Sequence, residues 1–165
     1  MRAGLSNASA LVGSLRAIVF DFDGTLAHTR IDFALMRRRI EEHIRGWGLW
    51  DPSLAQAGYV LELVDAAARR LDGFAERRAA YLAEAAAILE DIEMQGCVEA
   101  EPFPGVQEAM MQLADCGYPL GIITRNCRRA VEAVLRRHPL PHQVLLTRDD
   151  VAKVKPDPFH LLRAL

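Results

Sequence analysis

The chain has 165 residues, 51% of them hydrophobic and 25% charged, and its 20 Lys and Arg residues against 22 Asp and Glu residues give a formal charge of −2 with neutral histidines. This composition is typical of one globular domain, or of one domain that carries a large insertion. It excludes collagen-like and low-complexity chains, and without a basic stretch it gives no electrostatic reason to expect a nucleic-acid partner.

Cysteine content and hydropathy indicate a cytoplasmic protein. The three cysteines form no CxxC pair, which argues against both a disulfide scaffold and a zinc cluster. The apolar stretch at residues 8–15 is interrupted by serine and glycine and makes a poor signal peptide. No run approaches the roughly 18 apolar residues that a membrane span requires, so we expect no membrane partner.

The first expected element is a strand at residues 17–20, Ala-Ile-Val-Phe, which is wholly apolar as in a strand buried on both faces of a parallel sheet. From about residue 29 to residue 100 the pattern changes. Apolar residues there recur every three or four positions in three stretches, at residues 33–47, 54–71 and 81–92, and alanine is abundant. This pattern predicts three helices.

The rest of the chain alternates helices with strands. The expected elements, in chain order, are a helix at residues 106–113, a strand at 120–123, a helix at 127–137 and a strand at 144–146. Such alternation is typical of a parallel sheet flanked by helices. We therefore predict an α/β, Rossmann-like core formed by residues 1–28 and 101–165, with residues 29–100 inserted as an all-helical domain.

The strongest chemical signal is the segment at residues 21–26, Asp-Phe-Asp-Gly-Thr-Leu, directly after the first strand. Ligands of open α/β sheets bind beyond the carboxyl ends of the strands. In an extended segment Asp21 and Asp23 point the same way, and their carboxylates repel each other unless a cation such as Mg²⁺ holds them. Gly24 and Thr25 complete the segment, whose alternative interpretation is an ordinary polar turn.

Two further segments follow the second and third expected strands. Thr124, Arg125 and Asn126 stand just ahead of a helix, where a hydroxyl beside free backbone N–H groups suits a phosphate. Thr124 is equally typical of the N-cap of that helix. Lys155, next to Pro156, would neutralise phosphate charge as a point cation, although alone it is typical of a solvated surface loop.

In order and spacing, residues 21–26, Ile122-Ile123-Thr124 and Lys155-Pro156 resemble the first three motifs of the haloacid dehalogenase superfamily, in its branch of phosphoglycolate-phosphatase-like hydrolases. The resemblance covers the chain from about residue 17 to its end, and residues 29–100 fall where that branch carries its helical cap. It implies a Mg²⁺-dependent phosphatase that hydrolyses monoesters of small phosphorylated metabolites through an aspartyl-phosphate.

The resemblance also implies a role for each motif residue. Asp21 is the expected nucleophile, and Asp23 is the expected general acid and later general base. Mg²⁺ is expected on the Asp21 carboxylate and the Asp23 backbone carbonyl. The expected phosphate-binding residues are Thr124, Arg125, Asn126 and Lys155. Dehalogenases of the superfamily lack an acid at the position of Asp23, so the sequence resembles a phosphatase or phosphotransferase.

One feature of the family pattern is missing. The fourth motif, an acidic segment that completes the metal site, is expected one helix and one strand after Lys155, beyond Leu165. The pair Asp149-Asp150 precedes Lys155 and is interpreted as a loop or a helix-capping turn. We therefore expect a fragment, an interrupted reading frame, or a chain that needs a partner or self-associates through an incomplete sheet edge. The alternatives to catalysis by a phosphatase are a catalytically silent fragment or binding module and a phosphomutase.

Overall fold

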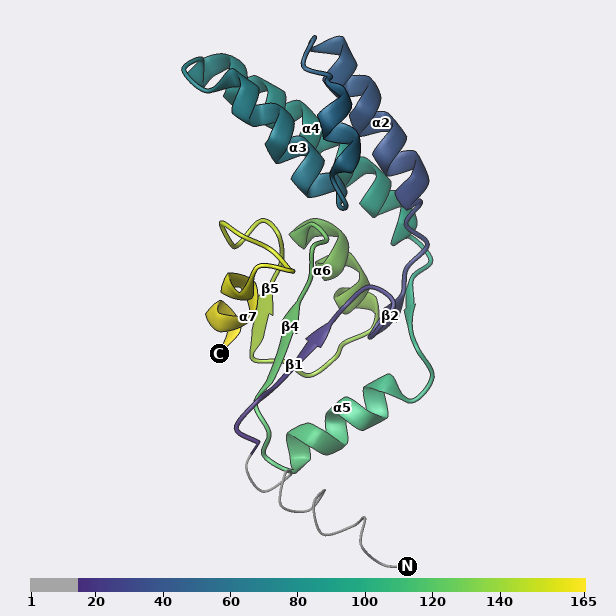
Figure 1. Ribbon diagram of the computed structural model, residues 1–165. Helices are drawn as coiled ribbons and strands as arrows, with labels where there is room; N and C mark the ends of the chain where they lie inside the picture. The colour runs from purple at the N-terminus through teal and green to yellow at the C-terminus, as the bar shows by residue number, and fades with distance from the viewer. Residues whose placement is uncertain (1–14) are drawn as a thin grey trace, which may run out of the picture. The chain divides into compact units, whose positions relative to one another are not determined.

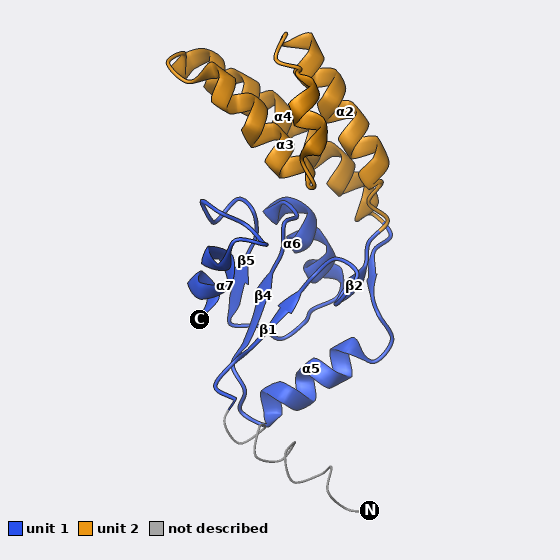
Figure 2. Ribbon diagram, in the orientation of Figure 1, with its two compact units in different colours: residues 1–29, 99–165 blue, residues 30–98 orange. Residues whose placement is uncertain are grey.

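The computed structural model describes residues 15–165 (Figure 1). The N-terminal stretch interpreted above as a poor signal peptide lies outside the described residues, except for Leu15. The chain divides into two compact units, one formed by residues 1–29 and 99–165 and the other by residues 30–98 (Figure 2). The first contains a parallel sheet with helices and the second is helical, which confirms the predicted α/β class.

The first unit contains a three-stranded parallel sheet in the order β1-β4-β5, labelled in Figure 1. The strands are β1 (Ile18–Asp21), β4 (Leu120–Ile123) and β5 (Val144–Leu146). All four residues of the central strand β4 are buried. The first strand lies one residue later than the predicted 17–20, so Asp21 is the last residue of the strand and shares its hydrogen-bonding register.

A second, two-stranded sheet joins the segments that leave and re-enter the first unit. Strand β2 (Ala27–His28) pairs antiparallel with β3 (Glu101–Pro102). The Phe103 N–H donates to the Leu26 carbonyl at 3.1 Å and extends this contact. Sequence periodicity does not predict these strands, because two residues are too few to show an alternation.

Within residues 15–165, the first unit also contains the helices α5 (Val106–Asp115), α6 (Arg128–Arg137) and α7 (Pro158–Ala164). Helix α5 packs against β4, and α7 packs against both β4 and β5. Helix α6 buries Ala130, Val131 and Val134. The structure therefore confirms the helices expected at residues 106–113 and 127–137.

The second unit consists of three α-helices and two short 3-10 helices. They are α2 (Phe33–Gly46), η1 (Pro52–Gln56), α3 (Val60–Ala68), η2 (Arg69–Leu71) and α4 (Ala75–Gly96). The prediction of a single helix at residues 54–71 was wrong, because η1 ends at Gln56, Ala57 is extended, and α3 starts only at Val60. None of the helices within residues 15–165 is long and apolar enough to cross a bilayer.

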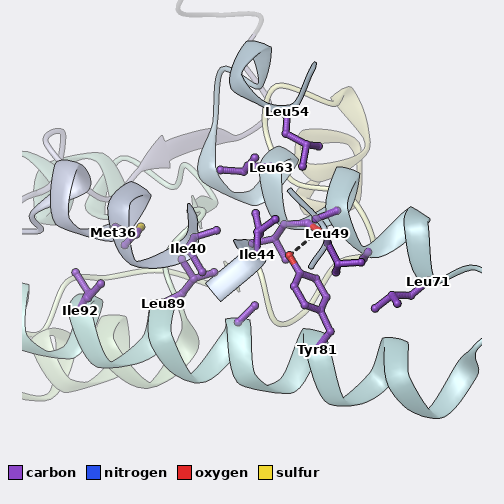
Figure 3. Packing of buried hydrophobic residues seen from close by; sticks show 14 residues of the cluster. Met36, Ile40, Ile44, Leu49, Leu54, Leu63, Leu71, Tyr81, Leu89 and Ile92 are labelled. Carbon is purple, nitrogen blue, oxygen red and sulfur yellow. Dashed lines mark hydrogen bonds between the residues drawn. The ribbon is translucent and has the colours of Figure 1, made fainter. Parts of the chain in front are cut away.

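Apolar side chains from all three α-helices form the core of the second unit (Figure 3). Tyr81 of α4 is fully buried, and its ring stacks on that of His43 at 5.0 Å. The Tyr81 hydroxyl donates to the Val64 carbonyl at 3.3 Å. Burial raises the pKa of Tyr81 to about 12, so the hydroxyl keeps the proton that it donates.

The two ends of the second unit lie against each other. The Arg30 N–H donates to the Gly96 carbonyl at 2.8 Å. A Cβ at Gly96 would lie 2.7 Å from the Ile31 Cα, closer than non-bonded carbon atoms approach. Only glycine therefore fits at the last position of α4 without moving the backbone of the incoming segment.

Replacing Gly96 with alanine is expected to destabilise the protein by about 1–3 kcal/mol, the usual cost of overpacking, because the added methyl group meets Ile31 backbone atoms. Gly46→Ala is the matched control, since no atom lies within 4 Å of the added Cβ at that helix end. We expect the control to be neutral or stabilised by less than about 1 kcal/mol. Urea denaturation measures both variants, and equal free energies of unfolding would contradict the close approach.

Candidate active site

The parallel register places the ends of the three strands side by side. Asp21 is paired with Ile123, and Ile123 with Leu146. The next residues along the chain therefore emerge at one edge of the sheet. These are the segment with Asp23, the segment with Thr124, and the loop that begins at Thr147.

The Asp21 carboxylate is half-exposed and lies beside a cation. Its side chain is 46% exposed, and its Oδ1 lies 2.5 Å from the Lys155 Nζ. The same Oδ1 accepts from the Phe22 N–H at 2.7 Å. Lys155 also donates from Nζ to the Ile123 carbonyl at 3.4 Å. The structure therefore brings the predicted nucleophile and the predicted phosphate-binding lysine into contact.

The Asp23 carboxylate has different partners, which are neutral. Its Oδ2 accepts from the Thr124 hydroxyl at 2.8 Å, and its Oδ1 accepts from the Asn126 Nδ2 at 2.9 Å. Thr124 and Asn126 are both buried. Two residues predicted to hold phosphate thus fix the orientation of Asp23. The alternative N-cap position for Thr124 is wrong, because Cys127 caps α6 and accepts from the Ala130 N–H.

The remaining predicted residues lie in the turns around these side chains. Gly24 has φ = 75°, a conformation that favours glycine, and its N–H donates to the Ala27 carbonyl at 2.9 Å. Thr25 is exposed at the tip of this turn. Arg125 is half-buried, and its carbonyl accepts from the Arg148 Nη1 at 3.4 Å.

Two residues that sequence reasoning did not connect join the loop after β5 to the start of α6. Arg128 contacts Asp150 twice, through Nη2 to Oδ2 at 2.7 Å and through Nε to Oδ1 at 3.1 Å. Asp150 Oδ2 also accepts from the Thr147 hydroxyl at 2.6 Å. Asp149 accepts from the Arg128 N–H at 2.8 Å, and the acidic pair lies in the loop after β5.

Hydrogen bonds decide the ionisation of Asp150. Partial burial favours the neutral acid, but the bonds from Thr147 and the Arg128 guanidinium outweigh it and hold the pKa of Asp150 below its ordinary value of 3.8. The hydrogen bonds from Arg128 to Glu132 and Asp150 in turn raise the pKa of Arg128. The pair is therefore ionised at neutral pH and joins the two loops.

A fully buried histidine, His160 of α7, completes the surroundings of Lys155. Its Nδ1 lies 3.3 Å from the Lys155 backbone nitrogen and its Nε2 lies 3.1 Å from the Leu146 carbonyl oxygen. Burial lowers the pKa of His160 below its ordinary value of 6.5. Neither periodicity nor motif spacing singles out this residue, because its partners lie on other elements.

The oxygen donors at the strand ends fit Mg²⁺. No group of three or more His, Cys, Asp or Glu side chains within residues 15–165 is placed to hold a metal ion. Mg²⁺, however, is commonly bound by one or two carboxylates, with waters and substrate phosphate oxygens filling its other positions. The half-exposed Asp21 carboxylate supplies the hard oxygen ligands that such a site needs. Asp21 and the Asp23 carbonyl are the groups that would hold the ion.

Comparison with known proteins identifies similar chains. A family model for haloacid dehalogenase-like hydrolases matches residues 18–165. The pyrophosphatase PpaX of Bacillus mycoides is 39% identical over 67 residues, which cover 39% of this chain. The match spans 31% of that relative, less than a third of its length.

Solved structures with the same fold are also longer than this chain. A predicted phosphoglycolate phosphatase from Haemophilus somnus has a TM-score of 0.53 and 20% identity, over 90% of this chain and 69% of that one. A HAD phosphatase from Thermococcus onnurineus has a TM-score of 0.50 and 23% identity, over 91% and 70% of the two chains. At these identities the likeness shows the fold alone.

Asp150→Asn is expected to lower the free energy of unfolding by about 1–2 kcal/mol at neutral pH, because the amide keeps one acceptor oxygen and loses its charge toward Arg128. This value is at the low end for a charged hydrogen bond because the Asp150 side chain is 23% exposed. Since the pKa of Asp150 is lowered in the folded protein, its contribution is complete above 3.8 and is lost as the pH falls below that value.

Urea denaturation at neutral pH and below pH 3.8 checks this expectation. The unfolding free energies of wild type and Asp150→Asn should converge in acid. Asp115→Asn, which removes the same charge from the exposed end of α5, is the control and should match wild type within about 0.5 kcal/mol. A difference between wild type and Asp150→Asn that persists unchanged in acid would exclude the ion pair as its cause.

Proposed function

The chain belongs to the haloacid dehalogenase-like hydrolase family, and we propose from this premise that it is a Mg²⁺-dependent phosphatase of small phosphorylated metabolites. The observation that carries the proposal is the contact between the half-exposed Asp21 carboxylate and the Lys155 ammonium group. Asp23, two residues after Asp21, accepts a hydrogen bond from the Thr124 hydroxyl. The name of PpaX, a pyrophosphatase, supports hydrolysis of a phosphate compound.

Asp21 is suited to attack phosphorus. Both of its described contacts, with Lys155 and with the Phe22 N–H, involve Oδ1, so Oδ2 is the oxygen available as the nucleophile. In the first step a bond forms between Oδ2 and phosphorus while the bond from phosphorus to the ester oxygen breaks. The product is a phosphorylated aspartate, which divides the hydrolysis into two easier steps.

Asp23 is suited to transfer the protons. Its carboxyl group is fixed by the Thr124 hydroxyl and the Asn126 amide, so it does not need to be ordered when substrate binds. As the ester bond breaks, Asp23 gives a proton to the departing oxygen. It then takes a proton from the water that attacks phosphorus, and this attack releases inorganic phosphate and restores the Asp21 carboxylate.

Lys155 is suited to neutralise the charge on the transferred phosphoryl group. Its Nζ lies against the nucleophile and is partly exposed, with 27% of the side chain accessible. A cation at this position stabilises charge on the equatorial phosphoryl oxygens during transfer. Bound Mg²⁺, held by Asp21 and the Asp23 carbonyl, would supply further charge neutralisation.

The first test is release of inorganic phosphate from a panel of small phosphate monoesters in the presence of Mg²⁺. Asp21→Asn is expected to lower the rate by on the order of 10³-fold or more, because the amide is not a nucleophile. Asp23→Asn is expected to lower it by about 10²–10⁴-fold through loss of proton transfer. Asp115→Asn, which makes the same change on the exposed end of α5, should keep the wild-type rate.

Circular dichroism of each variant establishes that the fold survives the substitution. Unchanged turnover in folded Asp21→Asn would remove Asp21 from the mechanism. Folded wild-type protein without any phosphate release would instead favour a catalytically silent chain, and transfer of phosphate between hydroxyl groups without release would favour a phosphomutase.

The second test removes the cation. EDTA is expected to abolish phosphate release, and added Mg²⁺ is expected to restore it, because the single charge of Lys155 does not neutralise the negative charges of the phosphoryl group and the Asp21 carboxylate together. Calorimetric titration with Mg²⁺ gives a readout independent of turnover. Binding should be lost in Asp21→Asn and kept in Asp115→Asn, and equal binding by the two variants would place the ion elsewhere.

A further inference from the structure

The position of Lys155 depends on contacts of its backbone as well as of its ammonium group. The Lys155 N–H donates to the Nδ1 atom of His160, five residues later on α7. The His160 ring is fully buried, and its Nε2 lies 3.1 Å from the Leu146 carbonyl oxygen at the end of β5. The ring therefore connects the lysine backbone to the sheet edge that carries the site.

These two partners determine which ring nitrogen of His160 carries the proton. A backbone N–H can only donate, so Nδ1 must be the unprotonated acceptor toward Lys155. A carbonyl can only accept, so Nε2 must carry the proton toward Leu146. Burial is the largest influence and lowers the pKa of His160, and the charge of Lys155 lowers it further, whereas the hydrogen bond to the Leu146 carbonyl and the charges of Asp21 and Asp150 act in the opposite direction. The ring is thus neutral when it makes both bonds.

The Leu146 carbonyl is shared between the second and third motifs. It accepts from the Thr124 N–H at 3.0 Å as well as from His160. Lys155 Nζ reaches back to the carbonyl of Ile123, the residue before Thr124. Lys155 is therefore held at both ends, by the His160 ring at its backbone and by Ile123 and Asp21 at its ammonium group.

We propose that His160 is a positioning residue whose ring fixes the Lys155 backbone to the end of β5, so that the Lys155 ammonium group contacts Asp21. This inference rests on the phosphatase proposed above, in which the same ammonium group also contacts the phosphoryl oxygens. A histidine that merely fills space would be replaceable by an apolar side chain of similar size. The two hydrogen bonds distinguish the positioning role from this simpler one.

Three variants separate the two bonds. His160→Asn keeps an acceptor near the position of Nδ1 and so preserves the bond from Lys155. His160→Gln keeps an amide near the position of Nε2 and so preserves only the bond to Leu146. His160→Leu removes both bonds and keeps the apolar volume. His142→Leu is the control, because His142 contacts Leu140 in the loop before β5.

NMR of the Lys155 side chain tests the positioning without any need for turnover. In wild-type protein the side-chain signals should shift when Asp21 is replaced by Asn, because the two groups are in contact. This response to Asp21→Asn should be lost in the His160→Gln and His160→Leu backgrounds and retained in His160→Asn and His142→Leu. A response retained in every background would overturn the proposal.

The ring itself gives a spectroscopic signature. Imidazole ¹⁵N signals of His160 should show a protonated Nε2 and an unprotonated Nδ1 at neutral pH. The opposite tautomer, or a ring protonated at both nitrogens, would overturn the proposal. This measurement does not depend on a bound ligand or on the stability of any variant.

Phosphate affinity connects the positioning to the proposed function. The dissociation constant for inorganic phosphate, measured by calorimetry, should rise about fivefold to tenfold in His160→Gln and His160→Leu, as expected for one lost hydrogen bond, and stay near wild type in His160→Asn. If the NMR response follows this pattern while wild-type protein neither binds phosphate nor releases it from esters, the phosphatase proposal fails and the positioning of Lys155 stands. Normal turnover with a Lys155 response independent of His160 would overturn the positioning role and leave the phosphatase proposal intact.

Discussion

The site depends on the parallel register of β1, β4 and β5. This register places Asp21, Ile123 and Leu146 in one row, and each of the three contributes an atom to the site. Asp21 gives its carboxylate, Ile123 gives the carbonyl that Lys155 contacts, and Leu146 gives the carbonyl that accepts from Thr124 and His160. A slip of one residue in any strand would turn these groups to the wrong side. The geometry of the site therefore depends mainly on how the backbones of the three strands are paired.

Two aspartates only two positions apart lie in different surroundings. Asp21 faces a cation and is half-exposed, whereas Asp23 accepts hydrogen bonds from two buried neutral side chains. Carboxyl groups in different environments are able to take different chemical roles in one reaction. The division is produced by partners from other segments, with Lys155 beside Asp21 and with Thr124 and Asn126 around Asp23.

The sequence predicts those elements that depend only on residues close together in the chain. The apolar strand before Asp21 and helix α6 follow from neighbouring residues, and both are present in the structure. The break of the helix expected at residues 54–71 was missed because apolar spacing continues through it. The contacts of Asp150 with Arg128 and of His160 with Leu146 join different elements, so no period or motif could reveal them. The catalytic roles of the motif residues stay predictions.

The pairing of β2 with β3 makes the helical unit a module with adjoining ends. Ala27 is paired with Pro102 where the chain leaves and re-enters the first unit, and Arg30 bonds Gly96 within the second. The pairing of β2 with β3 therefore brings the two ends of the inserted segment together. The long insertion then adds little loop-closure entropy to the pairing of β1 with β4. Insertions whose ends adjoin are readily exchanged during evolution. A change in the length or sequence of the helical unit therefore need not disturb the strand register that builds the site.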